Sequence, residues 1–278
     1  MLLDLLKAVV LGTVQGITEF LPVSSTAHLI ITEKLFKLDQ NVYGLSFDMF
    51  INLGTLIAVI AFFWSDLKDI FGRMRLPSSK KPLSKQEKLP WLIILATIPV
   101  GLVGLALEKK IESDFRSLEV IVFSLIIVGI LMILVERFSK PSTKAGEPTS
   151  LQIVLTSLSQ CIALIPGVSR SGITISTAMA LGVDRVTAAR YSFMLSIPIT
   201  LAATLSRLVK FGSAVVQGTV AGDVILFYCV GGLTSLIVSF LTLRFLMVYY
   251  KKHSLTSFAI YRFVLAAVLI LVINRTAL

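Results

Sequence analysis

The sequence predicts an all-α integral membrane protein that forms a single membrane domain over residues 1–278. Composition is one reason: 55% of the residues are hydrophobic, 15% are charged and the mean hydropathy is +0.88, whereas about a quarter of a soluble domain is charged. The second reason is that uncharged stretches recur, each close to the ~17–25 residues that cross a bilayer core. They are Met49–Ser65, Trp91–Leu107, Val120–Val135, Tyr191–Ser206 and Val224–Leu243. A buried core helix could explain one such stretch but not five.

The apolar region near the start of the chain, Ala8–Thr32, is interrupted at its centre. Glu19 divides it into two uncharged runs that are each too short to cross a membrane. Pro22 and the serines beside it oppose a straight helix. We therefore expect a re-entrant helix–loop–helix that dips to mid-membrane and returns, enclosed by protein or by a water-filled cavity. Leu151–Val183 is broken in the same way and predicts a second re-entrant segment.

The two broken regions indicate an internal repeat. A shift of 145 residues places similar residues on one another: Gln15 on Gln160, Val23 on Val168 and Ser24 on Ser169. The halves would cover about 1–140 and 148–278, each with a re-entrant helix–loop–helix followed by three transmembrane helices. An odd number of crossings reverses the second half, so the expected fold is an inverted-topology repeat.

The basic residues behind the net charge of +10 are concentrated in the loops between the spans. This distribution is better explained by membrane topology than by binding to nucleic acid. In this topology one side holds more than half of the 26 lysines and arginines, in Lys68–Lys88, Arg137–Lys144, Arg185, Arg190 and Arg244–Lys252. That side should be cytoplasmic, and both termini would face outward. We expect no nucleic-acid partner, and Cys161 and Cys229 are expected to be inert packing residues.

Charged and polar side chains inside the broken regions predict a functional site. A charge at bilayer depth costs at least ~2.5–3.5 kcal/mol, so Glu19 and Arg170 need partners or a water-filled cavity, and they can neutralise each other if the two loops meet. The guanidinium of Arg170 suits phosphate oxygens. Around them we expect substrate-binding groups at Gln15, Ser24, Thr26, Gly167, Ser169, Ser171 and Thr174. Arg262, in the weak last span, is expected to snorkel or to pair with another helix.

Ser25 and His28 are three residues apart, so on a helix a hydroxyl and a base could be neighbours. Each of these residues also has a structural interpretation. Serines in membrane helices often bond to carbonyl groups, and the Glu19–Arg170 pair could be only a buried ion pair. Their combination on two facing loops favours a site.

Two motifs carry a resemblance to a known family. The first runs from Gln15 to Glu19 and then through Pro22-Val-Ser-Ser-Thr-Ala-His28; the second is Pro166-Gly-Val-Ser-Arg-Ser-Gly-Ile-Thr174. With these motifs the chain resembles the undecaprenyl-diphosphate phosphatase family associated with bacitracin resistance, over essentially its whole length. Two positions depart from the family pattern, because Gln15 stands where the family often has Glu, and Ala27 where Gly is common.

The resemblance implies hydrolysis of undecaprenyl diphosphate to the monophosphate, which recycles the cell-wall lipid carrier. Catalytic roles would fall on Ser25 as nucleophile, His28 as base or leaving-group acid, Arg170 as diphosphate clamp and Glu19, which would orient water, His28 or a cation. In the alternative chemistry water attacks directly and Ser25 only binds phosphate. The rival function is a secondary transporter or flippase for an anionic lipid or solute, since inverted repeats with broken helices are its usual architecture.

The expected partners follow from the same resemblance. They are a polyprenyl diphosphate lipid substrate and the bacterial plasma (inner) membrane, crossed several times, with the site open to the external (periplasmic) side. A divalent cation, Mg²⁺ or Ca²⁺, is an open expectation; Glu19 could bind it together with substrate phosphates. No organic cofactor is expected, and a homodimer is a further open expectation.

Overall fold

The computed structural model describes residues 1–39, 43–76, 82–140, 147–217 and 222–276, and in these ranges the regular structure is helical, without strands. Five helical segments are long and apolar enough to cross a membrane: Lys85–Leu107, Leu118–Phe138, Arg185–Ser213, Gly222–Tyr249 and Thr256–Asn274. A sixth candidate bends by 70° between Ser46–Phe62 and Trp64–Gly72. The predicted all-helical membrane fold is therefore confirmed, with five or six spans among the described residues.

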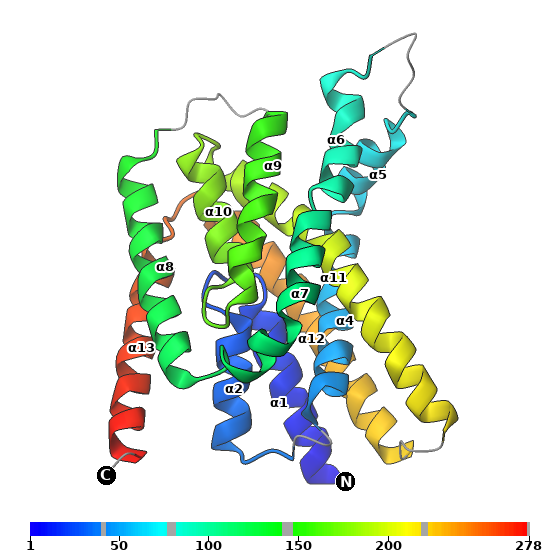
Figure 1. Cartoon of the computed structure of the whole chain (residues 1–278), viewed down its shortest axis with the longest axis vertical. Coiled ribbons are helices and arrows are strands. Elements are labelled where there is room, and N and C mark those ends of the chain that lie inside the picture. Colours follow the sequence, from blue (N-terminus) through cyan, green and yellow to red (C-terminus); the bar gives the residue numbers. More distant parts are fainter. Residues whose placement is uncertain (40–42, 77–81, 141–146, 218–221, 277–278) are drawn as a thin grey trace.

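The helices follow one another along the chain and run mostly along the long axis of the molecule (Figure 1). They are α1 (Leu2–Thr18), α2 (Ser25–Leu35), α4 (Leu45–Phe62), α5 (Trp64–Gly72), α6 (Lys85–Leu95), α7 (Ile98–Ser113), α8 (Leu118–Phe138), α9 (Ser150–Leu158), the 3₁₀ helix η1 (Ser159–Leu164), α10 (Arg170–Ala180), α11 (Arg185–Val216), α12 (Gly222–Tyr249) and α13 (Thr256–Thr276). Ser84 begins α6 with a capping box to Glu87, and Thr149 begins α9 in the same way with Gln152.

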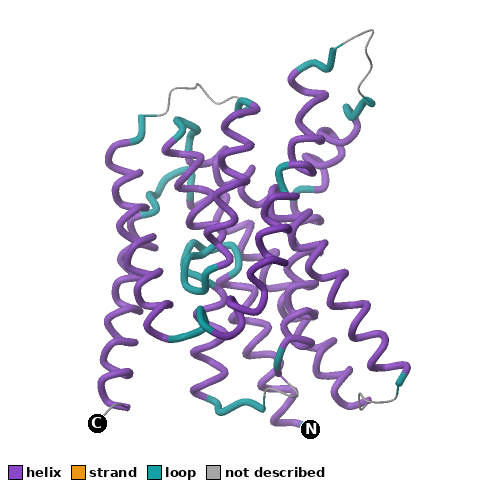
Figure 2. Tube along the Cα trace, viewed as in Figure 1, coloured by secondary structure: helices purple, strands orange, loops and turns teal. Residues whose placement is uncertain are grey.

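Both predicted breaks are present. In the first half α1 ends at Thr18 and α2 begins at Ser25; in the second, η1 ends at Leu164 and α10 begins at Arg170. The two connecting loops lie near the middle of the bundle rather than at either end (Figure 2). The polar residues of the two motifs are thereby placed between helices.

Small residues allow α12 to lie directly against α1 and α4. A side chain at Gly12 of α1 would collide with the carbonyl oxygen of Gly231, and one at Gly54 of α4 with that of Gly232. Ser235 adds a hydrogen bond of 2.8 Å to the carbonyl of Ile51. Close approach through small residues and interhelical hydroxyl bonds is typical of helix pairs in membranes.

The outer faces of the helices are apolar. On α8 the exposed side chains Phe123, Ile127, Ile130 and Leu134 recur at helical spacing on one face. The outward side chains of α12 and α13 include Leu233, Ile237, Leu241, Val264, Val268 and Leu271. Such surfaces suit lipid tails and not water, as expected for a protein that spans a membrane.

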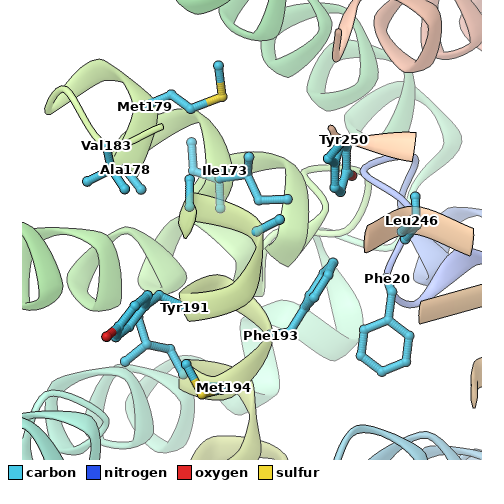
Figure 3. Packing of buried hydrophobic residues seen from close by; sticks show 14 of the residues in the cluster. Phe20, Ile173, Ala178, Met179, Val183, Tyr191, Phe193, Met194, Leu246 and Tyr250 are labelled. Carbon is cyan, nitrogen blue, oxygen red and sulfur yellow. The ribbon is translucent and has the colours of Figure 1, made fainter. Parts of the chain in front are cut away.

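The largest hydrophobic cluster anchors the first loop. Phe20, directly after Glu19, is 1% exposed and meets the ring of Phe193 on α11 edge-to-face, with the ring centroids 5.4 Å apart. Figure 3 shows Phe20 and Phe193 together with Leu246 of α12. Burying Phe20 fixes the position of Glu19 relative to α11.

The basic connections gather at one end of the molecule. The end of α5, the start of α6, the end of α8 and the start of α9 lie at the end of the molecule opposite the start of α1 and the end of α13 (Figure 1). Arg73, before α6, is 3.5 Å from Glu147, before α9. The predicted grouping of Lys68–Lys88 with Arg137–Lys144 on one side agrees with this contact, although residues 77–81 and 141–146 lie outside the described ranges.

Candidate active site

The site begins with two serines that hold the ends of the two loops. Ser24 caps α2 and accepts a hydrogen bond from the Ala27 amide at 3.4 Å, while Ser169 caps α10 and accepts from the Gly172 amide at 3.2 Å. Both have positive φ angles, 74° and 72°, which residues other than glycine rarely adopt. Strained backbone of this kind persists only where the surroundings enforce it, and it concentrates at functional sites.

Glu19 is the centre of a hydrogen-bond network between the loops. Its Oε2 accepts from Ser25 Oγ at 2.7 Å and from Gln15 Nε2 at 2.9 Å. Its Oε1 accepts from Arg170 Nη2 at 2.6 Å. The predicted meeting of Glu19 with Arg170 is confirmed, and the charge-assisted bond to Ser25 directs a hydroxyl onto the same carboxylate.

Arg170 spans two elements. One end of its fork pairs with Glu19, and Nη1 donates to Thr200 Oγ1 of α11 at 2.9 Å. The side chains of Arg170 and Glu19 are only 17% and 12% exposed. An ion pair so deeply buried needs hydrogen bonds at both ends to offset desolvation, and Thr200 and Ser25 supply them.

These groups line a cavity of about 380 Å³. It takes in eight of the predicted site residues, namely Gln15, Glu19, Ser24, Ser25, Thr26, Gly167, Ser169 and Arg170. Apolar side chains such as Leu29, Met49 and Ile199 complete the wall. The volume is at the lower end for ligand sites and suits a polar headgroup better than a whole lipid.

Three predicted residues lie outside this lining. His28 Nδ1 is 2.7 Å from the Ser24 carbonyl, and its Nε2 is 2.7 Å from the Tyr261 hydroxyl. Both ring nitrogens are therefore engaged, and the structure does not bring His28 to Ser25. Ser171 donates to the Leu21 carbonyl at 3.1 Å, which links the loops, and Thr174 Oγ1 lies 2.6 Å from Ser192 Oγ.

The structure also adds residues that the sequence analysis missed. Asn52 of α4 accepts from Gln15 Nε2 at 3.1 Å, and Asp48, Thr204, Arg116 and Arg207 line the same cavity. A signal for Asn52 was available, because it is an amide inside the uncharged stretch Met49–Ser65, and polar groups in a span mark functional sites. Arg116 and Arg207 lie outside both motifs, so the motifs gave no signal for them.

Two buried oxygen atoms of residues that line the cavity, Gln15 Oε1 and Asp48 Oδ1, have no hydrogen-bond partner in the described part of the chain. With Glu19 they form a set of oxygen donors of the kind that Mg²⁺ and Ca²⁺ prefer. No group of three or more His, Cys, Asp or Glu able to hold a metal was found among the described residues. The donor set therefore fits a divalent cation only if substrate oxygens or water complete the coordination.

Arg262 of α13 braces both loops from behind the cavity. Its side chain is fully buried and donates to four carbonyl groups at 2.8–3.2 Å, those of Pro22, Gly167, Ser124 and Leu125. Two of these belong to the loops and two to α8. Of the two predicted roles, snorkelling is wrong and helix pairing is correct.

Replacing Arg262 with methionine should destabilise the fold by at least about 3 kcal/mol, because buried carbonyls left without donors each cost roughly 1–3 kcal/mol. Thermal unfolding of the purified protein in detergent measures this. Arg137→Met, at the exposed end of α8, removes the same charge and should change the melting temperature little. Equal melting temperatures for Arg262→Met and Arg137→Met would contradict the bracing role.

These features define a multi-pass helical membrane protein with a charged cavity between two broken-helix loops. Residues 8–268 match the family model described as "Bacitracin resistance protein BacA", and the chain belongs to this family. It is 41% identical over 268 residues to the undecaprenyl-diphosphatase of Rubrobacter xylanophilus, covering 96% of this chain and 97% of that one. The undecaprenyl-diphosphatase of Thermodesulfovibrio yellowstonii is 40% identical over 268 residues, with 96% and 97% covered. That of Moorella thermoacetica is 37% identical over 270 residues, with 97% and 98% covered.

Proposed function

We propose that this protein hydrolyses undecaprenyl diphosphate to undecaprenyl phosphate and inorganic phosphate, and so recycles the lipid carrier of bacterial cell-wall synthesis. The observation that carries the proposal is the contact of Ser25 Oγ with Glu19 beside Arg170 in the cavity. A hydroxyl, a carboxylate and a guanidinium within hydrogen-bond distance suit phosphoryl transfer, which needs positioning and charge neutralisation. The names of the relatives support the same reaction.

In the proposed first step Ser25 Oγ attacks the distal phosphorus while Glu19 takes its proton. The Oγ–P bond forms, the bond from that phosphorus to the bridging oxygen breaks, and the lipid leaves as its monophosphate. Arg170 neutralises charge on the transferring group. Glu19 then releases its proton to solvent, takes one from an attacking water and passes it to Ser25 Oγ as the Oγ–P bond breaks. Inorganic phosphate is the second product.

The geometry favours Glu19 over His28 as the base, because Glu19 already accepts from Ser25 and His28 is engaged with Ser24 and Tyr261. We propose that His28 positions the Ser24 backbone, and with it the first loop. Gln15, Thr26, Gly167 and Ser169 line the cavity and would hold phosphate oxygens. Ser171 and Thr174 would act from outside, as supports of the two loops.

A divalent cation would be held by Glu19, Asp48 and the Gln15 oxygen together with substrate phosphates. When bound it would neutralise charge on the diphosphate. All of these ligands come from one chain, so the proposed chemistry does not need a homodimer. The homodimer stays a prediction.

We also propose the inverted-topology repeat. Its support is that α2 and α10 have the same length, 11 residues, and that their capping serines share the unusual positive φ. Helix pairing agrees as well: α12 packs on α1 and α4, as α6 packs on α9 and α11. The two re-entrant loops would then reach mid-membrane from opposite sides.

Sidedness gives a testable prediction. By the positive-inside rule the α5–α6 connection should be cytoplasmic and the α7–α8 connection external. In a background in which Cys161 and Cys229 are replaced by serine, Asp114→Cys should react with an impermeant thiol reagent in intact cells, and Ser84→Cys only after permeabilisation. The reverse pattern would place the termini in the cytoplasm.

The direct test of function is phosphate release from undecaprenyl diphosphate by the purified protein in detergent. We expect turnover that needs the intact Ser25–Glu19 contact. A secondary transporter or flippase needs an anion site but no hydroxyl aimed at a carboxylate, so the rival is less well supported. Binding of the lipid without any phosphate release would overturn the proposed function.

A further inference from the structure

Two further guanidinium groups line the cavity apart from the Glu19–Arg170 pair. Arg116 lies between α7 and α8, and Arg207 lies on α11. Both are partly buried, and neither forms a hydrogen bond or ion pair with the described part of the chain. Guanidinium groups that line a cavity without an ion-pair partner are suited to an anionic ligand.

The two arginines continue a polar stripe that begins at Arg170. Thr200, which accepts from Arg170, is followed on the cavity face of α11 by Thr204 and Arg207, at the spacing of one helix face. The seven-residue step from Thr200 to Arg207 corresponds to about 10 Å along the axis of α11. A helical side chain leans toward the N-terminus of its helix, so the guanidinium of Arg207 is expected on the Thr204 side of the Arg207 backbone.

Among the described residues that line the cavity, guanidinium groups outnumber carboxylates. The described lining residues include three arginines, Arg116, Arg170 and Arg207, and two carboxylates, Glu19 and Asp48. Glu19 is committed to Arg170, whereas Asp48 lies within electrostatic range of the carboxylate of Glu33 and of both Arg116 and Arg207. Arg116 and Arg207 therefore line the cavity without a direct ion-pair partner among the described residues, and both can contact an anionic ligand.

We propose that Arg116, Arg207 and Thr204 form a second anion subsite, which receives inorganic phosphate after it leaves Ser25. This inference rests on the proposed hydrolysis, because that reaction releases the phosphate. Two guanidinium forks and a hydroxyl match the oxygens of one phosphate dianion. The subsite lies along α11 toward the end of the molecule that carries both termini (Figure 1), so it would lead the product away from Arg170.

The test is the affinity for inorganic phosphate, titrated by phosphorus NMR on purified protein in detergent. This measurement needs no turnover, so a failure of the hydrolysis proposal would not hide its result. Titrations in an Arg170→Lys background reduce competition from the first site. We expect Arg116→Gln and Arg207→Gln to weaken phosphate binding about tenfold each, the size expected for losing one charge-assisted contact.

The matched control is Lys210→Gln, which removes one charge from an exposed position on the same helix and should leave phosphate affinity unchanged. Arg207→Lys keeps the charge and should lose less phosphate affinity than Arg207→Gln, which separates ligand binding from misfolding. In the otherwise native enzyme, Arg207→Gln should raise the inhibition constant of phosphate while the KM for the lipid changes little.

Unchanged phosphate affinity in the Arg116→Gln/Arg207→Gln double variant would overturn the subsite. Equal rises in KM and inhibition constant would also overturn it, because the arginines would then belong to the substrate clamp.

Discussion

Alanine in place of Ser25 is expected to reduce kcat for undecaprenyl diphosphate at least about a thousandfold, because loss of a nucleophile removes the covalent route entirely. The hydroxyl donates to Glu19 at 2.7 Å, and no other hydroxyl among the described residues contacts that carboxylate. Phosphate release by the purified variant measures the effect. Thr32→Ala is the matched control, since Thr32 lies on the same helix but bonds to the His28 carbonyl.

A double-variant comparison tests which residue serves Ser25 as base. If Glu19 and Ser25 act as one unit, Ser25→Ala/Glu19→Gln should lose little more activity than Ser25→Ala alone. In contrast, the activity losses caused by His28→Ala and Ser25→Ala should multiply in the double variant, because His28 acts by positioning the first loop. A Ser25→Ala enzyme that retained a tenth of its activity would contradict the covalent route and favour direct attack by water.

Lysine in place of Arg170 is expected to lower kcat about 10²- to 10³-fold, the range seen when one donor to a developing anion is lost. Lysine keeps the charge but cannot contact Glu19 and Thr200 through one planar fork. Arg185→Lys is a close control, because Arg185 makes a two-point ion pair with Glu136 away from the cavity. It should lower the melting temperature without lowering kcat in the folded enzyme.

The activity of the Arg170→Ala variant could contradict the role of Arg170 as a diphosphate clamp. If Arg170→Ala hydrolysed the lipid at near-native rates, Arg170 would be only the structural partner of Glu19. Melting curves recorded with and without substrate would show whether the variant is folded and still binds.

The broken helices were predictable because their cause is local. A carboxylate at Glu19, and a proline and serines just after it, exclude a straight apolar span whatever surrounds them. The pairing of Glu19 with Arg170 was predictable for a similar reason, since neither charge could stay unpaired at that depth.

Side-chain direction was not predictable in the same way. Ser25 and His28 do lie on one helix, three residues apart, as expected. Their partners, however, come from the first loop and α13, and these contacts turn the hydroxyl toward Glu19 and the imidazole toward Tyr261. Arg262 shows the same limit, because the four carbonyl groups it contacts come from three separate segments.

The contacts of Arg262 have a consequence for how the protein works through its cycle. One guanidinium holds the Pro22 carbonyl of the first loop and the Gly167 carbonyl of the second. Moving the loops apart, as alternating access requires of the two halves of a carrier, would strand a buried charge that has no acidic partner among the described residues. The loops should therefore stay joined throughout turnover. Substrate and products then exchange by diffusing into and out of a site of constant shape, and catalysis needs no rocking of the bundle.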